Sequence, residues 1–444
     1  MDSPRARRIA IVGAGPSGLF AAQSLVRQDR VPVAVDFVDR LPVPYGLLRY
    51  GVAPDHQNIK AVAGVLAATF DSPDVRLHGN VELGRDVSRA DLLAAYDAVI
   101  YAVGASEDQH LGIPGEDLPG SGSARTFVAW YSGHPDAPAE DLTGVEAVAV
   151  IGVGNVAVDV ARILVKEPTA LDVTDMPEPV LEELHRHTVR DVYVVARRGP
   201  QHGAFTTVEL RELLHTEGAQ VVLDPTCLEG IDEQGLDRRT KGNLEVLREI
   251  AGQVSDAPRC RLHLLFWRRP VALEGDGRVQ TLVLERTRLD DTGRVVGTGE
   301  IERVAVQLVL RSIGYRSIPV AEIPFDPARN VIANVEGRVV DEAGVVQPRE
   351  YAVGWVKRGP VGVIGTNKSD AAQTVRHLLE DLEADPDAAA PSADLLDVLA
   401  ERGVRVTSLE DWRAIDSAEV ALGQAKGRPR TKLPTWDALL DLCR

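Results

Sequence analysis

The clearest hydrophobic pattern in the chain comes at its start. The apolar run Ile9–Val12 is followed at once by the glycine-rich segment Gly13–Gly18 and then by helical spacing over Leu19–Val26. A second apolar run, Val33–Val38, ends at Asp39. A short buried strand, a glycine turn, a helix and another strand are typical of one βαβ unit. We therefore expect a parallel sheet to begin here.

The same pattern returns near the middle of the chain. Val148–Ile151 predicts a strand, Gly152–Ala157 a turn and Val158–Val165 a helix. The next strand of this unit is predicted over residues 191–196, because the intervening residues 167–190 contain three prolines and resemble an insertion with its own short helix. The chain thus contains two βαβ units of the same design.

The remaining patterns extend these two units. Buried strands that end in glycine are predicted at Tyr96–Gly104 and Leu308–Gly314, and residues 260–310 have the pattern of β-structure with hairpin turns. A helix is predicted from Ser369 to about Leu382, and helical spacing dominates the residues after 393.

Both predicted turns have glycine spacing that suits a dinucleotide. The first glycine permits the tight turn, the second lets backbone N–H groups approach a pyrophosphate, and a small third residue lets the helix lie close to the sheet. One such motif is a weak signal, but two, each between a strand and a helix, indicate two dinucleotide sites. The three positions are Gly13, Gly15 and Gly18 in the first turn and Gly152, Gly154 and Ala157 in the second.

The two units differ at the end of the second strand. In the first unit this place is taken by Asp39, whose carboxylate would accept hydrogen bonds from a ribose diol and repel a 2′-phosphate. In the second unit it is taken by Arg197 and Arg198, whose guanidinium groups match a 2′-phosphate. The first site is therefore predicted to bind FAD, and the second NADP(H) rather than NAD(H).

Composition and charge exclude several classes of protein. The 444 residues allow roughly three core-sized units at about 150 residues each. The formal charge is 49 − 66 = −17, so a nucleic-acid partner is not expected. The three cysteines, Cys227, Cys260 and Cys443, form no C-x-x-C pair, which excludes a disulfide framework, a zinc finger and the cysteine pair of a disulphide reductase. With no signal peptide and no apolar run long enough to span a bilayer, we expect a cytoplasmic protein without a bound metal.

Several motifs together resemble the adrenodoxin-reductase type of ferredoxin–NADP⁺ reductase, especially its bacterial members. The resemblance covers nearly the whole chain. It rests on residues 41–47, 51–56, 152–157, 197–200, 205–212, 311–315 and the long block 354–368.

The resemblance implies a set of cofactor residues. For FAD it implies Gly13, Ala14, Gly15, Pro16, Ser17, Gly18, Asp39, Arg40, Gly46, Leu47, Val81, Trp355, Gly362, Val363 and Ile364. For NADP it implies Gly152, Val153, Gly154, Asn155, Val156, Arg197, Arg198, Glu209 and Gly362.

The same resemblance places two candidate catalytic residues near the reacting rings. It implies that His56 lies near the flavin and that Glu209 lies at the nicotinamide ribose and carboxamide. From the residues alone, His56 could equally cap a helix that begins near Gln57, and Glu209 could be a first-turn acid favoured by the helix dipole. Hydride transfer needs mainly the alignment of two rings, so neither residue has to carry a proton.

The order of the motifs predicts an α/β fold with two Rossmann-like three-layer dinucleotide-binding domains. The FAD unit begins the chain and resumes after the NADP unit, so the NADP domain is inserted into the FAD domain. The predicted boundaries are 1–107 for the first part of the FAD domain, 108–325 for the NADP domain, and 326–444 for the second part with a C-terminal helical extension.

The leading functional prediction is an FAD-dependent ferredoxin–NADP⁺ oxidoreductase. NADPH delivers two electrons as a hydride, and a flavin can pass them singly to an iron–sulfur protein. Three alternatives remain open: an NADPH-dependent flavin monooxygenase or oxidase, an electron-input subunit of a larger complex, and a non-catalytic flavoprotein scaffold.

An acidic reductase needs a local basic surface to dock an acidic ferredoxin. Three groups are candidates for this surface: Arg211; Arg238 and Arg239 with Lys241; and Arg268 with Arg269. We expect the second group to contribute to docking, because it interrupts an otherwise acidic chain.

Overall fold

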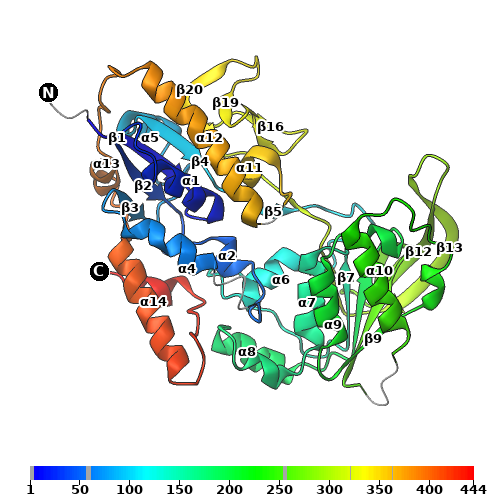
Figure 1. The fold of residues 1–444 in the computed structure, drawn as a ribbon. Coiled ribbons are helices and arrows are strands. Elements are labelled where there is room, and N and C mark those ends of the chain that lie inside the picture. The colour runs from blue at the N-terminus through cyan, green and yellow to red at the C-terminus, as the bar shows by residue number, and fades with distance from the viewer. Residues whose placement is uncertain (1–4, 57–61, 254–257, 321, 363) are drawn as a thin grey trace.

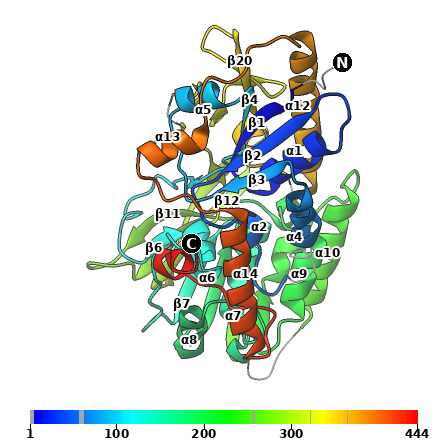
Figure 2. The same ribbon diagram turned by 90° about the vertical axis from the view of Figure 1, so that its left-hand side faces the viewer.

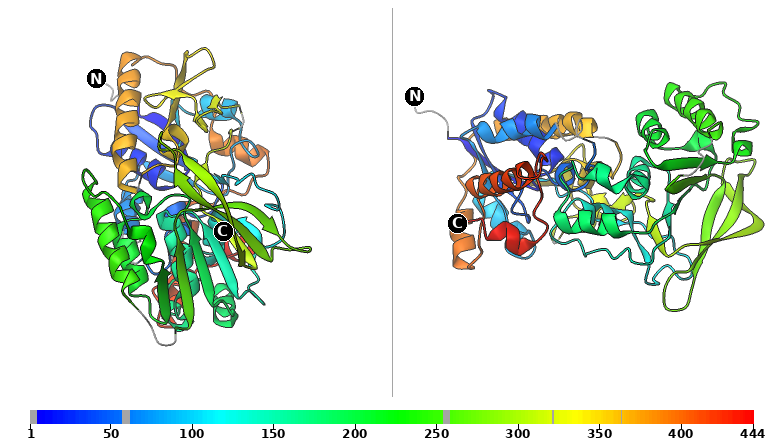
Figure 3. Two further views of the ribbon diagram at one scale, coloured as in Figure 1. Left: turned by 90° about the vertical axis from the view of Figure 1, so that its right-hand side faces the viewer. Right: turned by 90° about the horizontal axis from the view of Figure 1, so that it is seen from below.

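The computed structural model describes residues 5–56, 62–253, 258–320, 322–362 and 364–444. It has two lobes, each built around one largely parallel sheet (Figures 1 and 3). Among these residues, no helix is both long enough and apolar enough to cross a membrane.

The first lobe contains a seven-stranded sheet in the order β18-β19-β20-β4-β1-β2-β3. Strands β20, β4, β1, β2 and β3 are parallel neighbours, and β18 and β19 add an antiparallel edge. The strands are β1 Arg7–Val12, β2 Val33–Val38, β3 Val75–His78, β4 Ala98–Tyr101, β18 Asn334–Val335, β19 Arg338–Val340 and β20 Val346–Ala352. Strands from both ends of the chain thus share one sheet.

Both faces of this sheet are buried. Successive side chains of β1 point to opposite faces, so they pack into two different cores. Ile9 and Ile11 pack into a core with α1 and α12, whereas Ala10 and Val12 pack into another with α5 and α13. This gives the three layers that the sequence predicts. The helices are α1 Pro16–Val26, α5 Arg89–Ala95, α12 Ile364–Ala384 and α13 Leu395–Glu401.

The second lobe contains a six-stranded parallel sheet in the order β6-β14-β7-β8-β10-β9. Helices α6, α7, α9 and α10 cover one face and the antiparallel sheet β11-β12-β13 covers the other. The strands are β6 Ser121–Ser123, β7 Ala147–Ile151, β8 Asp191–Val195, β9 Ala219–Leu223, β10 Cys260–Leu265, β11 Arg268–Glu274, β12 Thr281–Leu289, β13 Val295–Ala305 and β14 Leu308–Arg311. The helices are α6 Ala124–Tyr131, α7 Asn155–Val165, α9 Thr207–Leu214 and α10 Arg238–Ala251.

The chain passes between the lobes at a short antiparallel pair. β5 (Glu107–Asp108) pairs with β15 (Tyr315–Arg316), so the outgoing and returning segments lie side by side. The second sheet is therefore formed wholly by residues that lie between β4 and β20 in the sequence. The exact boundaries at 107 and 325 stay a prediction.

The C-terminal helices α13 and α14 (Leu409–Gln424) lie on the side that faces the viewer in Figure 2, and the segment after α14 contacts α8 (Glu178–Arg186) of the second lobe. Glu178 on α8 accepts contacts from Lys426 and Arg428, which follow α14. Trp436 donates its indole N–H to Asp136 at 2.7 Å. The remaining elements are α2 Leu47–Tyr50, α4 Val62–Ala67, α8 Glu178–Arg186, α11 Trp355–Arg358, α14 Leu409–Gln424, α15 Trp436–Leu440, β16 Phe325–Asp326, β17 Val331–Ile332 and the 3₁₀ turns Ala68–Asp71, Pro168–Leu171, Pro200–His202 and Pro225–Leu228.

One predicted helix boundary is wrong. α12 begins at Ile364 and not at Ser369, so Gly365 and Asn367 are helical. Glycine and asparagine favour turns in isolation, but packing of the helix against the sheet overrides this weak local preference.

Candidate functional site

The first glycine turn has the geometry of an anion-binding loop. Gly13 adopts φ +108°, and a Cβ added there would lie 2.6 Å from the carbonyl oxygen of Ala102, so only glycine fits. α1 begins at Pro16, and its N-cap residue Gly15 offers no side chain to the free N–H groups of the first turn. These N–H groups therefore remain for a phosphate-like ligand.

Asp39 fastens this turn. Its carboxylate accepts the N–H of Ala14 at 2.6 Å and the N–H of Leu41 at 2.9 Å. Its backbone carbonyl accepts the N–H of Val81 at 2.9 Å, while the side chain of Val81 is buried in the core. Burial raises the pKa of Asp39, and the two N–H donors oppose that rise. Sequence patterns did not reveal this structural role of Asp39.

A second loop lies beside the first glycine turn. The N–H of Tyr45 donates to the carbonyl of Ala14 at 2.8 Å. This bond places Gly46 and Leu47 next to the N-terminus of α1, and Leu47 is partly exposed. Two of the predicted FAD segments are therefore adjacent in space.

The C-terminal part of the chain supplies a third segment. Gly354 lies so close to Ser17 that an added Cβ would be 2.1 Å from the serine hydroxyl oxygen. Trp355 follows, and its ring stacks on Tyr315 with centroids 5.5 Å apart. Gly362 adopts φ +92° and is exposed. The two aromatic rings come from different lobes and meet at the crossover.

Three other predicted FAD residues have different surroundings. Arg40 forms an ion pair with Asp136, so its guanidinium is not wholly free for a ligand. Val363 lies outside the described residues, and Ile364 is the first residue of α12.

The second glycine turn repeats the design of the first. Gly152 adopts φ +134°, and a Cβ there would lie 2.1 Å from the carbonyl oxygen of Ser312. Gly154 is the N-cap residue of α7, and a Cβ added to it would meet no atom within 4 Å. The Asn155 side chain accepts the N–H of Thr206 at 2.9 Å, which ties this turn to the start of α9. The turn therefore offers uncapped N–H groups beside open space.

Arg197 and Arg198 follow the carboxyl end of β8, next to this turn. Both side chains are exposed, and neither makes an ion pair with any residue that the structure describes. Their positive charge is thus available to an anion.

Both candidate catalytic residues meet at the junction of the lobes. His56 Nε2 lies 2.7 Å from Glu212 Oε2 and 3.3 Å from Glu209 Oε2. His56 and Glu209 are the two predicted residues, and Glu212 lies one helical turn after Glu209. His56 belongs to the first lobe, whereas both glutamates lie on α9 in the second. Residues 57–61 lie outside the described residues, so a capping role of His56 stays untested.

Arg162 on α7 is the centre of this cluster. Its side chain is 2% exposed and lies 3.0 Å from Asp55, 2.8 Å from Asp159 and 3.2 Å from Glu209. It also lies 3.4 Å from Glu212. One guanidinium therefore contacts four carboxylates from both lobes.

The buried charges shift two pKa values in opposite directions. Burial disfavours the charged form of Asp55, but hydrogen bonds from Arg162 and the charge of Lys166 hold its pKa below the usual range. Burial raises the pKa of Asp159 to about 7, with Arg162 opposing the rise and Glu209 adding to it. Perturbed carboxyl groups of this kind cluster at functional sites.

Sequence patterns missed Asp55, Asp159, Arg162 and Glu212. A usable signal existed on α7, where Asp159 and Arg162 stand three residues apart and all the residues after Asn155 are otherwise apolar. Charged residues on a buried helix face have to find partners.

The ligand atoms of His56, Glu209 and Glu212 lie within 4.8 Å of one another, close enough to hold a metal ion. Arg162 Nη1, however, already contacts both glutamates and places a positive charge beside them. We therefore describe the group as a charge network.

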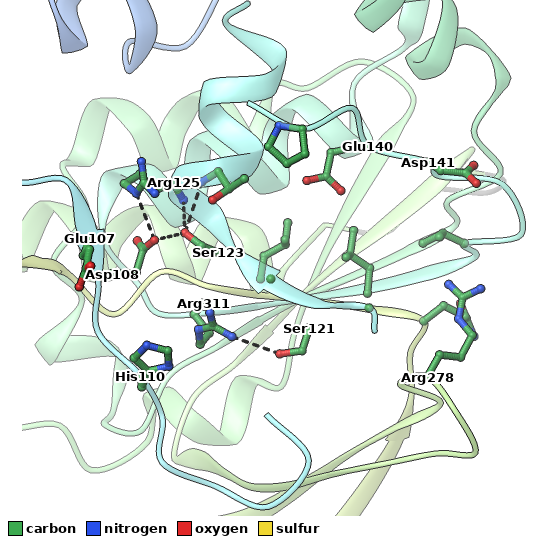
Figure 4. A pocket seen from close by; sticks show the side chains of 18 of the residues that line it. Glu107, Asp108, His110, Ser121, Ser123, Arg125, Glu140, Asp141, Arg278 and Arg311 are labelled. Atoms are coloured by element: carbon green, nitrogen blue, oxygen red, sulfur yellow. Dashed lines mark hydrogen bonds and ion pairs between the residues drawn. The ribbon is translucent and has the colours of Figure 1, made fainter. Parts of the chain in front are cut away.

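A cavity of about 620 Å³ lies elsewhere, at the β6 edge of the second sheet (Figure 4). Two ion pairs join charged residues of its lining, Asp108 with Arg125 and Glu107 with Arg316, and Arg311 donates to Ser121 at 3.2 Å. None of its lining residues is a predicted cofactor ligand.

Several known proteins are similar to this chain in sequence and in architecture. The profile of the pyridine nucleotide-disulphide oxidoreductase family matches residues 7–247. The NADPH-ferredoxin reductase FprA of Mycobacterium leprae is 45% identical over 449 residues, with 97% of each chain covered. The mitochondrial NADPH:adrenodoxin oxidoreductase of Homo sapiens is 41% identical, with 98% of this chain and 91% of that protein covered.

The chain belongs to the adrenodoxin reductase-type family of NADPH-ferredoxin reductases. The structure of this chain is similar to the solved structure of Mycobacterium tuberculosis FprA in complex with NADPH. The TM-score is 0.93 at 43% sequence identity, with 99% of each chain covered. The adrenodoxin reductase-type resemblance and the α/β fold predicted from the motifs are thus confirmed.

This adrenodoxin reductase-type chain lacks the cysteine pair that the name of the broader disulphide oxidoreductase family suggests. Its three cysteines are free, and Cys260 and Cys443 are buried in different lobes. The match to the disulphide oxidoreductase profile therefore concerns the nucleotide-binding architecture, and the chain has no redox-active cysteine pair.

Proposed function

We infer that the chain is an FAD-dependent ferredoxin–NADP⁺ oxidoreductase. One NADPH supplies two electrons and becomes NADP⁺, one proton is released, and two molecules of a ferredoxin-type iron–sulfur protein each accept one electron. The observation that carries this inference is the pair of glycine turns with opposite neighbours, Asp39 beside one and Arg197 with Arg198 beside the other. The first turn belongs to the first lobe and the second turn to the second lobe, and the two lobes are in contact at His56 and Glu209.

The first lobe fits FAD. The uncapped N-terminus of α1 would take the pyrophosphate, and the free lone pairs of Asp39 would take the ribose. Gly46, Leu47 and the wall formed by Trp355 would line the flavin. When bound there, FAD would supply the redox chemistry, because a flavin can accept a hydride and release its electrons one at a time.

The second lobe fits NADPH. The N–H groups at Gly154 would take the pyrophosphate, and the open space above this glycine leaves room for it. Arg197 and Arg198 would bind the 2′-phosphate through charge-assisted hydrogen bonds. Glu209 would then lie toward the nicotinamide end.

The charge network positions the reacting groups. His56 is held by Glu212 and Glu209, and Glu209 is held in turn by Arg162. We propose that this chain of contacts fixes the carboxylate and imidazole beside the two rings and excludes water between the lobes.

The iron–sulfur centre has to come from a partner. The three cysteines of the chain lie far apart and are free, so they cannot ligate a cluster. This favours a separate ferredoxin over an electron-input subunit that carries its own clusters.

A basic patch on α9 and α10 is proposed as the ferredoxin-docking surface. It consists of Arg211, Arg238, Arg239 and Lys241, which are exposed and make no ion pair with described residues. Three of these cations lie in the first turn of α10, where the helix dipole disfavours positive charge. Such a placement is unfavourable for the helix itself and supports the proposal that an acidic partner binds there.

The other candidate group supports docking less well. Arg268 pairs with Glu302, and Arg269 pairs with Glu285. Their charge is thus neutralised within the chain. α9 also carries Glu209 and Glu212, so a partner on the basic patch would sit beside the charge network.

The domain boundaries and location are part of the proposal. We propose that residues 1–107 and 326–444 bind FAD and that residues 108–325 bind NADP, which the strand order of the two sheets supports. A cytoplasmic site of action is proposed from the composition and the free cysteines.

The decisive experiment is a spectrum followed by a coupled assay. The purified protein should show flavin absorbance and should reduce cytochrome c from NADPH much faster than from NADH, with a further increase when ferredoxin is added. A protein that binds no flavin after incubation with FAD, or that prefers NADH, would contradict the proposed function.

A further inference from the structure

Trp267 has an unusual backbone conformation. It lies between β10 and β11 and adopts φ +58°. The left-handed region is unfavourable for a bulky aromatic residue, and such strain persists only where surrounding contacts enforce it. The contacts of Trp267 therefore indicate what the strain achieves.

The ring of Trp267 fills the space beside Gly199. A Cβ added to Gly199 would lie 2.4 Å from Cζ2 and 2.6 Å from Cε2 of the ring. Gly199 itself has an ordinary φ of −74°, so its backbone does not call for glycine. The residue is small because the indole packs directly on it, and Gly199 follows Arg197 and Arg198 without a break.

The backbone of the same arginine pair is also held from this side. The N–H of Trp267 donates to the carbonyl of Arg198 at 3.2 Å, and the hydroxyl of Thr287 donates to the carbonyl of Arg197 at 2.9 Å. The N–H of Thr287 in turn donates to the carbonyl of Trp267 at 3.0 Å. Both arginine carbonyls are therefore fixed by residues far away in the sequence.

The arginine side chains themselves remain unpaired among the described residues. A fixed backbone preorganises this anion site in part, because only the two arginine side chains remain to be ordered when the anion binds. The ring of His202 lies edge-on to the ring of Trp267, with centroids 6.4 Å apart.

We propose that Trp267 is a positioning residue that sets the preference of this chain for NADPH over NADH. It acts through the Arg197–Gly199 turn, by holding both guanidinium groups where a 2′-phosphate binds. This inference rests on the proposed function, since it assumes that this turn binds the adenosine end of NADPH.

Three variants separate the ring from the backbone strain. Trp267→Phe keeps an aromatic ring, Trp267→Ala removes it and keeps the strain, and Trp267→Gly removes it and relieves the strain. Trp436→Ala is the matched control, because that indole contacts Asp136 at the C-terminal extension. Thermal unfolding and flavin content of each holoenzyme report whether it is folded.

The readouts are KM for NADPH and for NADH, and the Kd of adenosine 2′,5′-bisphosphate and of 5′-AMP. For the alanine and glycine variants we expect KM for NADPH and the Kd of the bisphosphate to rise about tenfold, the effect of losing roughly one well-placed charged contact. KM for NADH and the Kd of 5′-AMP should change less than about threefold. The phenylalanine variant should recover most of the NADPH preference, and Trp436→Ala should retain it.

Three outcomes overturn the proposal in distinguishable ways. If the wild-type protein does not prefer NADPH, the proposed function itself fails. If the wild type prefers NADPH but the alanine and glycine variants keep the same NADPH-to-NADH ratio, or lose both cofactors equally, Trp267 is only structural. Recovery in the glycine variant without recovery in the phenylalanine variant would also overturn it, because strain and not the ring would then matter.

Discussion

Arg162 makes two hydrogen bonds to Asp55, from Nε to Oδ2 and from Nη2 to Oδ1, each 3.0 Å long. Asp55 belongs to the first lobe and Arg162 to the second, and both side chains are nearly buried. A paired, two-point contact of this kind fixes orientation as well as distance. It joins the lobes at the place where the two cofactors would have to meet.

Removing this guanidinium should destabilise the protein strongly. We expect Arg162→Met to lower the free energy of unfolding by about 3–5 kcal/mol, because Asp55, Asp159 and Glu209 would lose their shared cation in a buried setting. Denaturant unfolding of the holoenzyme measures the change. Arg186→Met is the control, since the contacts of that exposed side chain among the described residues are with Glu183 and the carbonyl of Glu182 on its own helix, and it should change stability by less than about 0.5 kcal/mol. If the two substitutions lowered the free energy of unfolding equally, the contacts of Arg162 would stabilise the fold no more than an exposed ion pair does.

Asp159 should make stability depend on pH in a defined direction. Its pKa in the folded protein is about 7, above the ordinary value of 3.8, so the folded state binds a proton that the unfolded state has lost. This contribution is fully present below pH 3.8 and is lost as the pH rises through 7. Asp159→Asn cannot titrate, so its stability relative to the wild type should increase between pH 5 and pH 8. A difference between the two proteins that stays constant over this range would contradict the assignment.

The two glycines of the second turn should respond differently to a methyl group. Gly154→Ala places a Cβ in open space at an ordinary φ of −95°, so the protein should fold with flavin bound. The methyl group would nevertheless occupy the approach of the pyrophosphate, and we expect KM for NADPH to rise at least about tenfold. Gly152→Ala should instead impair folding, because its Cβ would lie 2.1 Å from the carbonyl of Ser312. An unchanged KM in a well-folded Gly154→Ala protein would place the dinucleotide elsewhere.

Charge reversal in the basic patch should affect ferredoxin and spare NADPH. For Arg238→Glu with Arg239→Glu we expect KM for ferredoxin to rise about tenfold and its dependence on salt to weaken, because the attraction to an acidic partner is screened and partly removed. Reduction of ferricyanide by NADPH measures the first half-reaction separately. Arg269→Gln is the comparison, since Glu285 already neutralises that arginine. Ferredoxin kinetics that stay the same in the double variant would exclude this docking surface.

Local patterns were sufficient to identify the two βαβ units, the acid after one and the arginine pair after the other. These signals are readable because a strand, its glycine turn and its helix are neighbours in sequence and obey short periodicities. The lack of a cysteine pair needed no structure either. The start of α12 was harder, because Gly365 and Asn367 have turn preferences that packing overrides.

Tertiary structure alone decided how the charges pair. Arg162 and Asp55 are 107 residues apart, and no local pattern links them. Likewise, Arg268 and Arg269 find acidic partners across β-strands, whereas Arg238 and Arg239 find none among the described residues. Electrostatic energy depends on distance and burial, which are set only when remote segments pack together. For the same reason the contact of Trp267 with Gly199 could not be read from either residue.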